Sequence, residues 1–136
     1  MSGRYFFLSI FCFFASDYFG QVSFKCFDSD TDANLKVSVE YSGDQPIKIR
    51  YRGQNNSMRL EQIKGSLTFE DGTATYSEAF NEILEGKING KYTFTHSGNW
   101  DYISYQRKDG RVFRFTINLD ESLLPNGVGF RSTPCY

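Results

Sequence analysis

Alternation of apolar and polar residues over short runs is the feature that most constrains the fold of this chain. In the clearest run Leu35, Val37, Val39 and Tyr41 alternate with Lys36, Ser38, Glu40 and Ser42. Successive side chains of a strand point to opposite faces, so this pattern predicts a strand with one buried face. The same pattern predicts strands over 47–52, 92–95 and 113–120, and weaker runs predict others over 22–27, 58–63, 66–70, 73–78 and 102–107.

Turn sequences rich in glycine separate these runs. They are Ser42-Gly43-Asp44, Gly53-Gln54-Asn55-Asn56, Asp71-Gly72, Asn89-Gly90, Asp109-Gly110 and Asn126-Gly127. Asn-Gly and Asp-Gly pairs favour the positive φ angles of tight hairpins. Strands joined by hairpins, with no parallel crossover, predict an all-β fold. We expect a small antiparallel up-and-down β-barrel, with a β-sandwich as the alternative.

One segment, 77–85, has a different pattern. Its apolar residues Ala79, Phe80, Ile83 and Leu84 have helical spacing, and Gly86 follows at the position of a C-terminal cap. We therefore expect one short helix here, which would cover one end of the barrel.

Residues 1–20 have the three parts of a secretory signal. Arg4 lies near the start, an apolar run covers 5–15, and a polar stretch precedes Gly20, after which we expect cleavage. The apolar run is shorter than the roughly 20 residues that a membrane-spanning helix needs. The sequence thus predicts a signal peptide over 1–20 and a single barrel domain over 21–136, with no membrane span. We expect the mature protein to be periplasmic or secreted.

The cysteines support the same compartment. Cys12 would leave with the signal, and Cys26 and Cys135 would remain as an even pair in an oxidising environment. We expect them to form a disulfide that ties the first strand to the last and closes the barrel; the alternative is two buried free thiols. Neither cysteine has CxxC spacing or a histidine at ligand distance, so we expect no metal site and no cofactor.

Charge and histidine content exclude several functions. The 15 basic and 16 acidic side chains nearly balance, which removes the electrostatic reason to expect a nucleic acid or an anionic membrane as partner. The single histidine, His96, has no serine or cysteine in a nucleophile elbow nearby, and a lone histidine in a polar loop is typical of a solvated side chain. We therefore expect no enzymatic activity.

An acidic segment early in the chain has the spacing of the start of a calcium loop. Asp28, Asp30 and Asp32 supply the first oxygen donors, but Ala33 stands where the loop needs glycine and Val39 where it needs glutamate. We interpret the segment as a solvated acidic turn between the first two strands.

The segment 95–102 is the most distinctive in the chain, since it holds the only tryptophan and the only histidine. Aromatic anchors among adaptable polar groups are typical of protein-binding loops. The predicted partner-binding residues are His96, Ser97, Asn99, Trp100, Asp101 and Tyr102. The alternative is a long turn whose Trp100 folds back and plugs the barrel end.

The sequence also resembles the bacterial periplasmic inhibitors of c-type lysozyme. Phe24-Lys25-Cys26 and Pro134-Cys135 match the two cysteines that bracket that family's barrel, and Ser97-Gly98 with Tyr102 matches its Ser-Gly-x-x-Tyr loop with one extra residue. The resemblance implies a disulfide-closed barrel whose loop enters the cleft of a lysozyme. A periplasmic immunity protein, which neutralises a toxin enzyme, would share the same features.

The leading hypothesis is an exported, non-enzymatic barrel that binds and blocks another protein, such as a cell-wall-active or toxin enzyme. Ser97, Asn99 and Asp101 would form hydrogen bonds in the target cleft, while Trp100 and Tyr102 would pack on its rim. The alternative is a calycin-like carrier of a small apolar ligand. A barrel filled by inward aromatic residues would exclude the carrier, and a cavity of several hundred Å3 would favour it.

Overall fold

The computed structural model describes residues 21–70, 72 and 74–136, so the expected signal peptide and Cys12 lie outside the described residues. Nine strands form one antiparallel sheet, followed by a short helix. The elements are β1 (Val22–Ser29), β2 (Lys36–Ser42), β3 (Gln45–Tyr51), β4 (Met58–Gln62), β5 (Thr68–Phe69), β6 (Thr75–Leu84), β7 (Lys87–Ser97), β8 (Trp100–Arg107), β9 (Val112–Ile117) and α1 (Leu119–Ser122).

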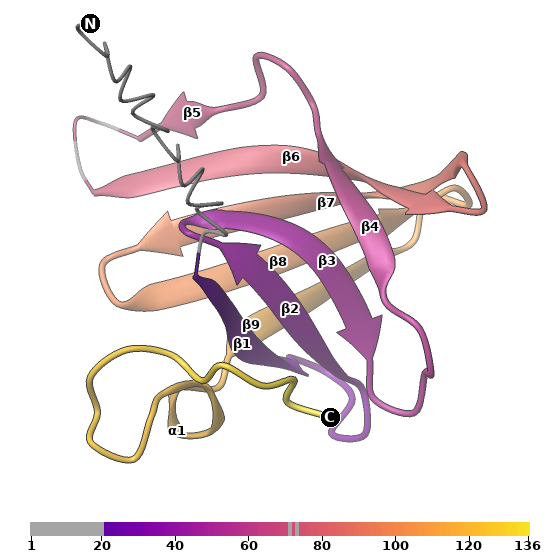
Figure 1. Ribbon diagram of the computed structural model, residues 1–136. Helices are drawn as coiled ribbons and strands as arrows, with labels where there is room; N and C mark the ends of the chain where they lie inside the picture. Colours follow the sequence, from indigo (N-terminus) through magenta and orange to yellow (C-terminus); the bar gives the residue numbers. More distant parts are fainter. Residues whose placement is uncertain (1–20, 71, 73) are drawn as a thin grey trace, which may run out of the picture.

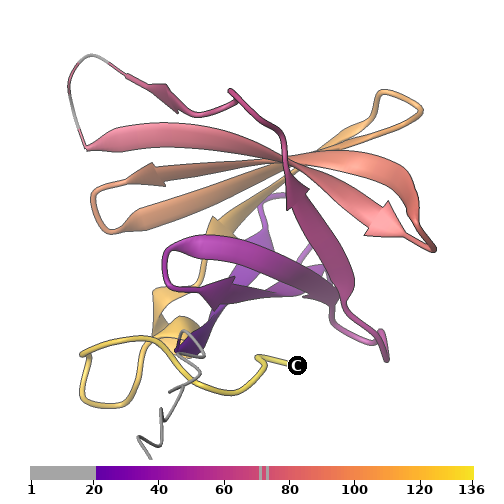
Figure 2. The same ribbon diagram turned by 45° about the horizontal axis from the view of Figure 1, so that its top comes forward.

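The sheet closes on itself because β4, the first strand in its order, also pairs with β6. The first part of β6 pairs with β5 and its last part pairs with β4, while β1 pairs with β9. Eight strands therefore form a closed barrel in the order β4-β3-β2-β1-β9-β8-β7-β6, and β5 lies beside β6 (Figures 1 and 2). The predicted antiparallel barrel is confirmed, and the sandwich is excluded.

Side chains that point inward pack the middle of the barrel. Val37, Val39 and Tyr41 of β2 are all buried, as their alternation predicts. The rest of the core consists of Phe27, Ile49, Leu60, Phe80, Tyr92, Phe94, Ile103, Tyr105, Phe115 and Ile117. The rings of Phe80 and Phe94 meet edge to face with centroids 5.4 Å apart, a favoured aromatic geometry.

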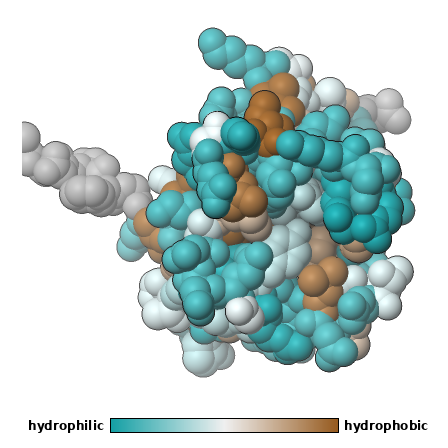
Figure 3. Space-filling model, turned by 90° about the vertical axis from the view of Figure 1, so that its right-hand side faces the viewer, coloured by the Kyte–Doolittle hydropathy of each residue, from teal (hydrophilic) through white to brown (hydrophobic). Residues whose placement is uncertain are grey.

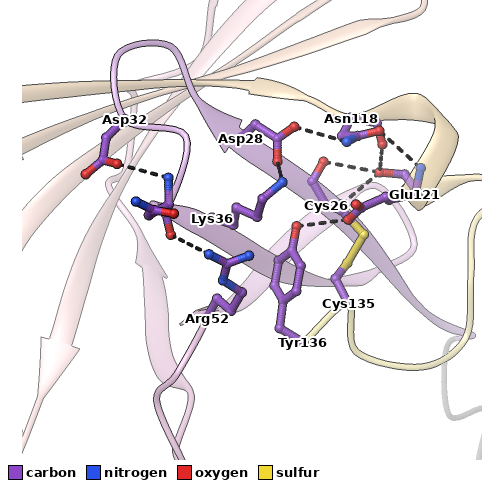
Figure 4. Close-up of polar contacts among 11 residues, drawn as sticks. Cys26, Asp28, Asp32, Lys36, Arg52, Asn118, Glu121, Cys135 and Tyr136 are labelled. Atoms are coloured by element: carbon purple, nitrogen blue, oxygen red, sulfur yellow. Dashed lines mark hydrogen bonds and ion pairs between the residues drawn. A yellow bond between two sulfur atoms is a disulfide. The ribbon is translucent and has the colours of Figure 1, made fainter.

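The C-terminal segment crosses the outer side of β1 and is tied there. Cys26 and Cys135, which are 109 residues apart in the chain, form the predicted disulfide (Figure 4). The Cys135 amide donates to Ser38 Oγ at 3.1 Å, and the Phe24 amide to the Arg131 carbonyl at 2.9 Å. The alternative of two free thiols is excluded, although Cys135 lies beyond β9 and so not in the last strand.

The helix expected over 77–85 is wrong, because these residues belong mainly to strand β6. Their apolar spacing is misleading because two inward positions of this strand, Glu78 and Glu82, are polar, yet both are buried. The helix of the structure is α1, so the strand predicted over 113–120 ends at Ile117 instead. Asn118 begins the helix by accepting the Glu121 amide at 3.1 Å.

One predicted turn is also wrong. The hairpin between β6 and β7 turns at Glu85 and Gly86, both with positive φ, and the Asn89-Gly90 pair lies inside β7. The register shifts beside Glu82, so that Asn89 is the extra residue of a β-bulge. By contrast, Gly43 and Gly110 lie in the β2–β3 and β8–β9 turns, as predicted. Within the described residues, no helix is long and apolar enough to span a membrane.

Candidate functional site at the β7–β8 hairpin

Strands β7 and β8 continue almost to the tip of their hairpin. Ser97 pairs with Trp100 and Thr95 with Tyr102, which leaves a turn of two residues in which Gly98 has φ +60°. Glycine adopts this left-handed conformation without steric cost. The segment predicted as a loop is therefore a tight hairpin with strand geometry on both sides.

The alternation of strand side chains divides the predicted partner-binding residues between two faces. Trp100 and Tyr102 lie on the outer face and are 47% and 41% exposed, and Asn99 is exposed at the turn. His96 and Asp101 pair with each other across the two strands on the inner face. The structure thus excludes the alternative in which Trp100 plugs the barrel end.

Hydroxyl groups surround the two exposed aromatic rings. Strand register aligns Ser77, Thr95, Tyr102 and Thr116 in one row and Thr75, Ser97 and Trp100 in the next; these seven residues are called the hairpin face. Hydrogen bonds join Thr75 to Ser97 and Ser77 to Thr95, each at 2.7 Å. None of the seven side chains carries a charge, so the hairpin face is itself neutral and rich in hydroxyl groups, and the Asp30 carboxylate accepts a hydrogen bond from Thr116 at its edge.

Behind this face, Asp101 joins two basic groups inside the barrel end. Its Oδ2 lies 2.8 Å from Lys25 Nζ, and its Oδ1 lies 2.7 Å from His96 Nδ1. The His96 ring also packs on Tyr76, with centroids 5.3 Å apart. The His96 side chain is 34% exposed, so it is partly solvated, but these two contacts also hold its ring within the chain. Asp101, expected to contact a partner, has its carboxylate engaged within this chain.

Lys25 is the residue of this site that sequence reasoning missed. Lys25 lies two residues before the buried Phe27, so both side chains are on the inner face of β1. This spacing in the sequence could have placed Lys25 inside the barrel. The ammonium lies 4.6 Å from the ring centroids of both Tyr41 and Phe130. Burial raises the pKa of the Tyr41 hydroxyl well above its usual value, and the negative charge of Asp101 adds to this effect.

The three early aspartates do not converge on a common site. Asp28 accepts from Lys36 Nζ at 2.9 Å and from Asn118 Nδ2 at 3.0 Å (Figure 4). Asp30 instead accepts from Thr116 Oγ1 at 2.7 Å. The Asp32 side chain accepts an amide of its own turn. The described part of the chain holds no cluster of three or more metal-ligating side chains.

Two hollows open at the barrel ends. One of about 540 Å3 lies beside the hairpin and is lined by Lys25, Asp101 and His96 among others. The other, of about 940 Å3, lies at the opposite end between the β3–β4 loop and the β6–β7 and β8–β9 hairpins. Figure 3 looks onto that opposite end, where hydrophobic patches interrupt a largely hydrophilic surface. Sequence reasoning missed this hollow because its walls come from segments far apart in the chain.

Comparison with known proteins adds no relative. No protein-family model, no curated protein and no solved structure matches this chain.

Proposed function

We propose that this protein is an exported, non-enzymatic binding protein that inhibits or neutralises another protein, with a cell-wall-active or toxin enzyme as the expected target. One observation carries the proposal: Trp100 and Tyr102 lie exposed at alternate positions of β8, on a neutral face of hydroxyl side chains. Tryptophan and tyrosine dominate the energy of protein interfaces, and serine supplies adaptable hydrogen bonds around them.

The hairpin is held in its binding shape before any partner arrives. Cross-strand hydrogen bonds fix Ser97 and Thr95 on the outer side, and Asp101 is fixed on the inner side by Lys25 and His96. Binding then requires little ordering of the chain, which lowers its entropic cost. A hairpin held in this way, with exposed aromatic residues on one face, is suited to occlude an enzyme cleft.

The resemblance to the periplasmic lysozyme inhibitors supports the choice of target. The disulfide joins β1 to the C-terminal segment through Cys26 and Cys135, the two cysteines that carry the resemblance. Ser97-Gly98 stands at the tip of the hairpin, where it would enter a cleft first. A toxin enzyme neutralised in the periplasm would need the same kind of occluding hairpin, so the proposal includes both targets.

The carrier of a small apolar ligand is less well supported. Tyr41, Tyr92, Phe94 and Phe115 are buried in the middle of the barrel, where such a ligand would have to lie. The larger hollow has the volume expected of a ligand site, about 940 Å3, but it opens at one end of the barrel and its floor is polar, which does not suit a purely apolar ligand.

The test is capture of c-type lysozyme, and of toxin enzymes from the periplasm, by immobilised protein. We expect Trp100→Ala to weaken binding at least about tenfold, since truncating an interface anchor costs about 2 kcal/mol. Ile88→Ala is the matched control. Like Trp100, Ile88 is an exposed apolar residue, but it lies at the end of β7 that is far from the β7–β8 hairpin. Equal capture by the wild type and Trp100→Ala would remove the hairpin face from the account.

A further inference from the structure

The hollow opposite the hairpin, called the mouth pocket, combines apolar walls with a polar floor. Its walls include Met58, Leu84 and Phe113, and its floor includes Glu82 and Tyr105. A volume of about 940 Å3 lies in the range of small-molecule sites, which are mostly apolar and hold a few convergent polar groups. The pocket therefore has the size and composition of a ligand site.

Glu82 is the unusual group of this floor. It is 1% exposed, and its carboxylate accepts hydrogen bonds from the Tyr92 hydroxyl, from the Tyr105 hydroxyl at 3.0 Å and from Asn89 Nδ2 at 2.7 Å. All three donors are neutral. Among the residues that the structure describes, no lysine, arginine or histidine forms an ion pair with Glu82. Buried charges are normally paired with an opposite charge, so a cation at this floor would be stabilised.

The local backbone is shaped around this carboxylate. The β-bulge of β7 turns the Asn89 side chain toward Glu82, and bulges of this kind commonly re-aim a side chain beside a site. Gly90 leaves room for the Tyr105 ring, which a Cβ at that position would overlap. A further hydroxyl, that of Tyr51, contacts the Tyr92 hydroxyl at 2.8 Å and lines the pocket.

Aromatic residues line the pocket together with the carboxylate. Tyr51 and Tyr105 both line the pocket together with Phe113, and cations are attracted to the faces of such rings. The basic side chains that line the pocket, Arg107 and Lys108, are exposed, and water and salt screen them. The electrostatic attraction is therefore strongest for a positive group that reaches the floor.

We propose that the mouth pocket binds a small organic cation, with an ammonium group against Glu82 and the tyrosine rings and a compact apolar body against Met58 and Phe113. The site lies at the opposite end of the barrel from the hairpin face. It is independent of the proposed inhibition, and a Trp100→Ala variant should bind the same ligand unchanged.

The test uses three probes of matched shape and different charge: 2-phenylethylammonium, neutral 2-phenylethanol and anionic phenylacetate. Binding is followed by amide chemical shifts in a nuclear magnetic resonance titration. We expect the ammonium probe to shift Leu84, Asn89 and Lys108 and to bind at least about tenfold more tightly than the alcohol, with phenylacetate weakest. Equal binding of the three probes, shifts elsewhere or no binding at all would overturn the proposal.

Two pairs of variants locate the charge recognition. Glu82→Gln should remove the preference for the ammonium probe, whereas the same change at Glu78, a buried carboxylate of the other barrel end, should leave it intact.

If Glu82→Gln does not fold, Leu84→Arg places a cation in the pocket from an exposed position. It should abolish ammonium binding, while Ile88→Arg, on the same hairpin but outside the pocket lining, should not. Unchanged binding by Leu84→Arg would contradict the site.

Discussion

Lys25 and Asp101 form an ion pair inside the barrel, with Nζ and Oδ2 2.8 Å apart and side chains that are 13% and 10% exposed. The pair joins β1 to β8 across the intervening strand β9. Asp101 lies between Trp100 and Tyr102, so a contact inside the barrel fixes the strand that presents both exposed aromatic residues outside. The ion pair therefore connects the packing of the barrel end to the proposed binding surface.

Removal of one partner of this pair should destabilise the protein strongly. Asp101→Asn leaves the Lys25 ammonium among the Tyr41 and Phe130 rings without a counter-charge, and we expect a loss of about 3 kcal/mol in the free energy of unfolding. The double variant with Lys25→Met should lose less than Asp101→Asn alone. Urea denaturation measures both.

The exposed pair of Arg59 and Glu61 supplies the control. Its side chains are 64% and 60% exposed with 3.7 Å between the charged atoms, so Glu61→Gln should change stability by less than about 1 kcal/mol. A similar small effect for Asp101→Asn would show that the inner ion pair does not hold the hairpin.

Loss of the disulfide should destabilise the barrel by about 4 to 5 kcal/mol, because the bond closes a loop of 109 residues in the unfolded chain. The Cys26→Ala/Cys135→Ala variant, compared with the oxidised wild type by urea denaturation, tests this value. Ser38 Oγ and the Arg131 carbonyl would still hold the C-terminal segment by hydrogen bonds. A loss below about 1 kcal/mol would mean that the crosslink adds little to these contacts.

Gly90→Ala should cost about 1 to 3 kcal/mol, because the added methyl group would overlap the Tyr105 ring in a packed barrel. The same change should cost less in a Tyr105→Ala background, where the ring is absent. The difference between the two measurements is the coupling energy of a double-mutant cycle. Equal costs in both backgrounds would rule out the steric explanation.

Stability should fall at alkaline pH because of the buried tyrosines. Burial raises the pKa of Tyr51 from 10.0 to about 12 and holds those of Tyr41 and Tyr92 well above 10.0. Above about pH 10 the unfolded chain releases these protons while the folded chain keeps them, so folding becomes less favourable by up to about 1.4 kcal/mol per pH unit for each group. The effect is absent below pH 10 and complete for Tyr51 near pH 12.

Denaturation at a series of pH values measures this slope. Tyr51→Phe should make the slope shallower between about pH 10 and pH 12, because it removes one of the linked protons. Tyrosinate absorbance of the folded protein provides a second readout. Identical slopes for the variant and the wild type would contradict the assignment of Tyr51.

The sequence predicted strands well where the inner face is apolar. Val37, Val39 and Tyr41 face the packed middle of the barrel, so hydrophobic contact imposes the period of two on β2. The strand predicted over 73–78 covers only the first part of β6, and the rest of β6 was missed because Glu78 and Glu82 take inward positions. Their hydrogen-bond donors come from other strands: Gln45 and Gln62 for Glu78, and Tyr92 and Tyr105 for Glu82. No local pattern reports such distant partners.

The candidate site was predictable in composition but not in orientation. The mixture of Trp100, Tyr102 and small polar residues marked the segment, whereas the face of each side chain follows from the strand register that the Gly98 turn sets. The ion pair of Lys25 and Asp101 spans 76 residues of sequence and needs the closed barrel to form. The mouth pocket likewise forms only in the folded barrel, where the β3–β4 loop meets the β6–β7 and β8–β9 hairpins.

Site-specific photo-crosslinking in the producing cell tests the central claim most directly. A photoreactive side chain at Trp100 should crosslink a partner enzyme, and the same side chain at Ile88, an exposed position at the other end of β7, should not. The account predicts one dominant product that is specific to position 100 and contains a cell-wall-active or toxin enzyme. Absence of that product, or equal products from both positions, would contradict it.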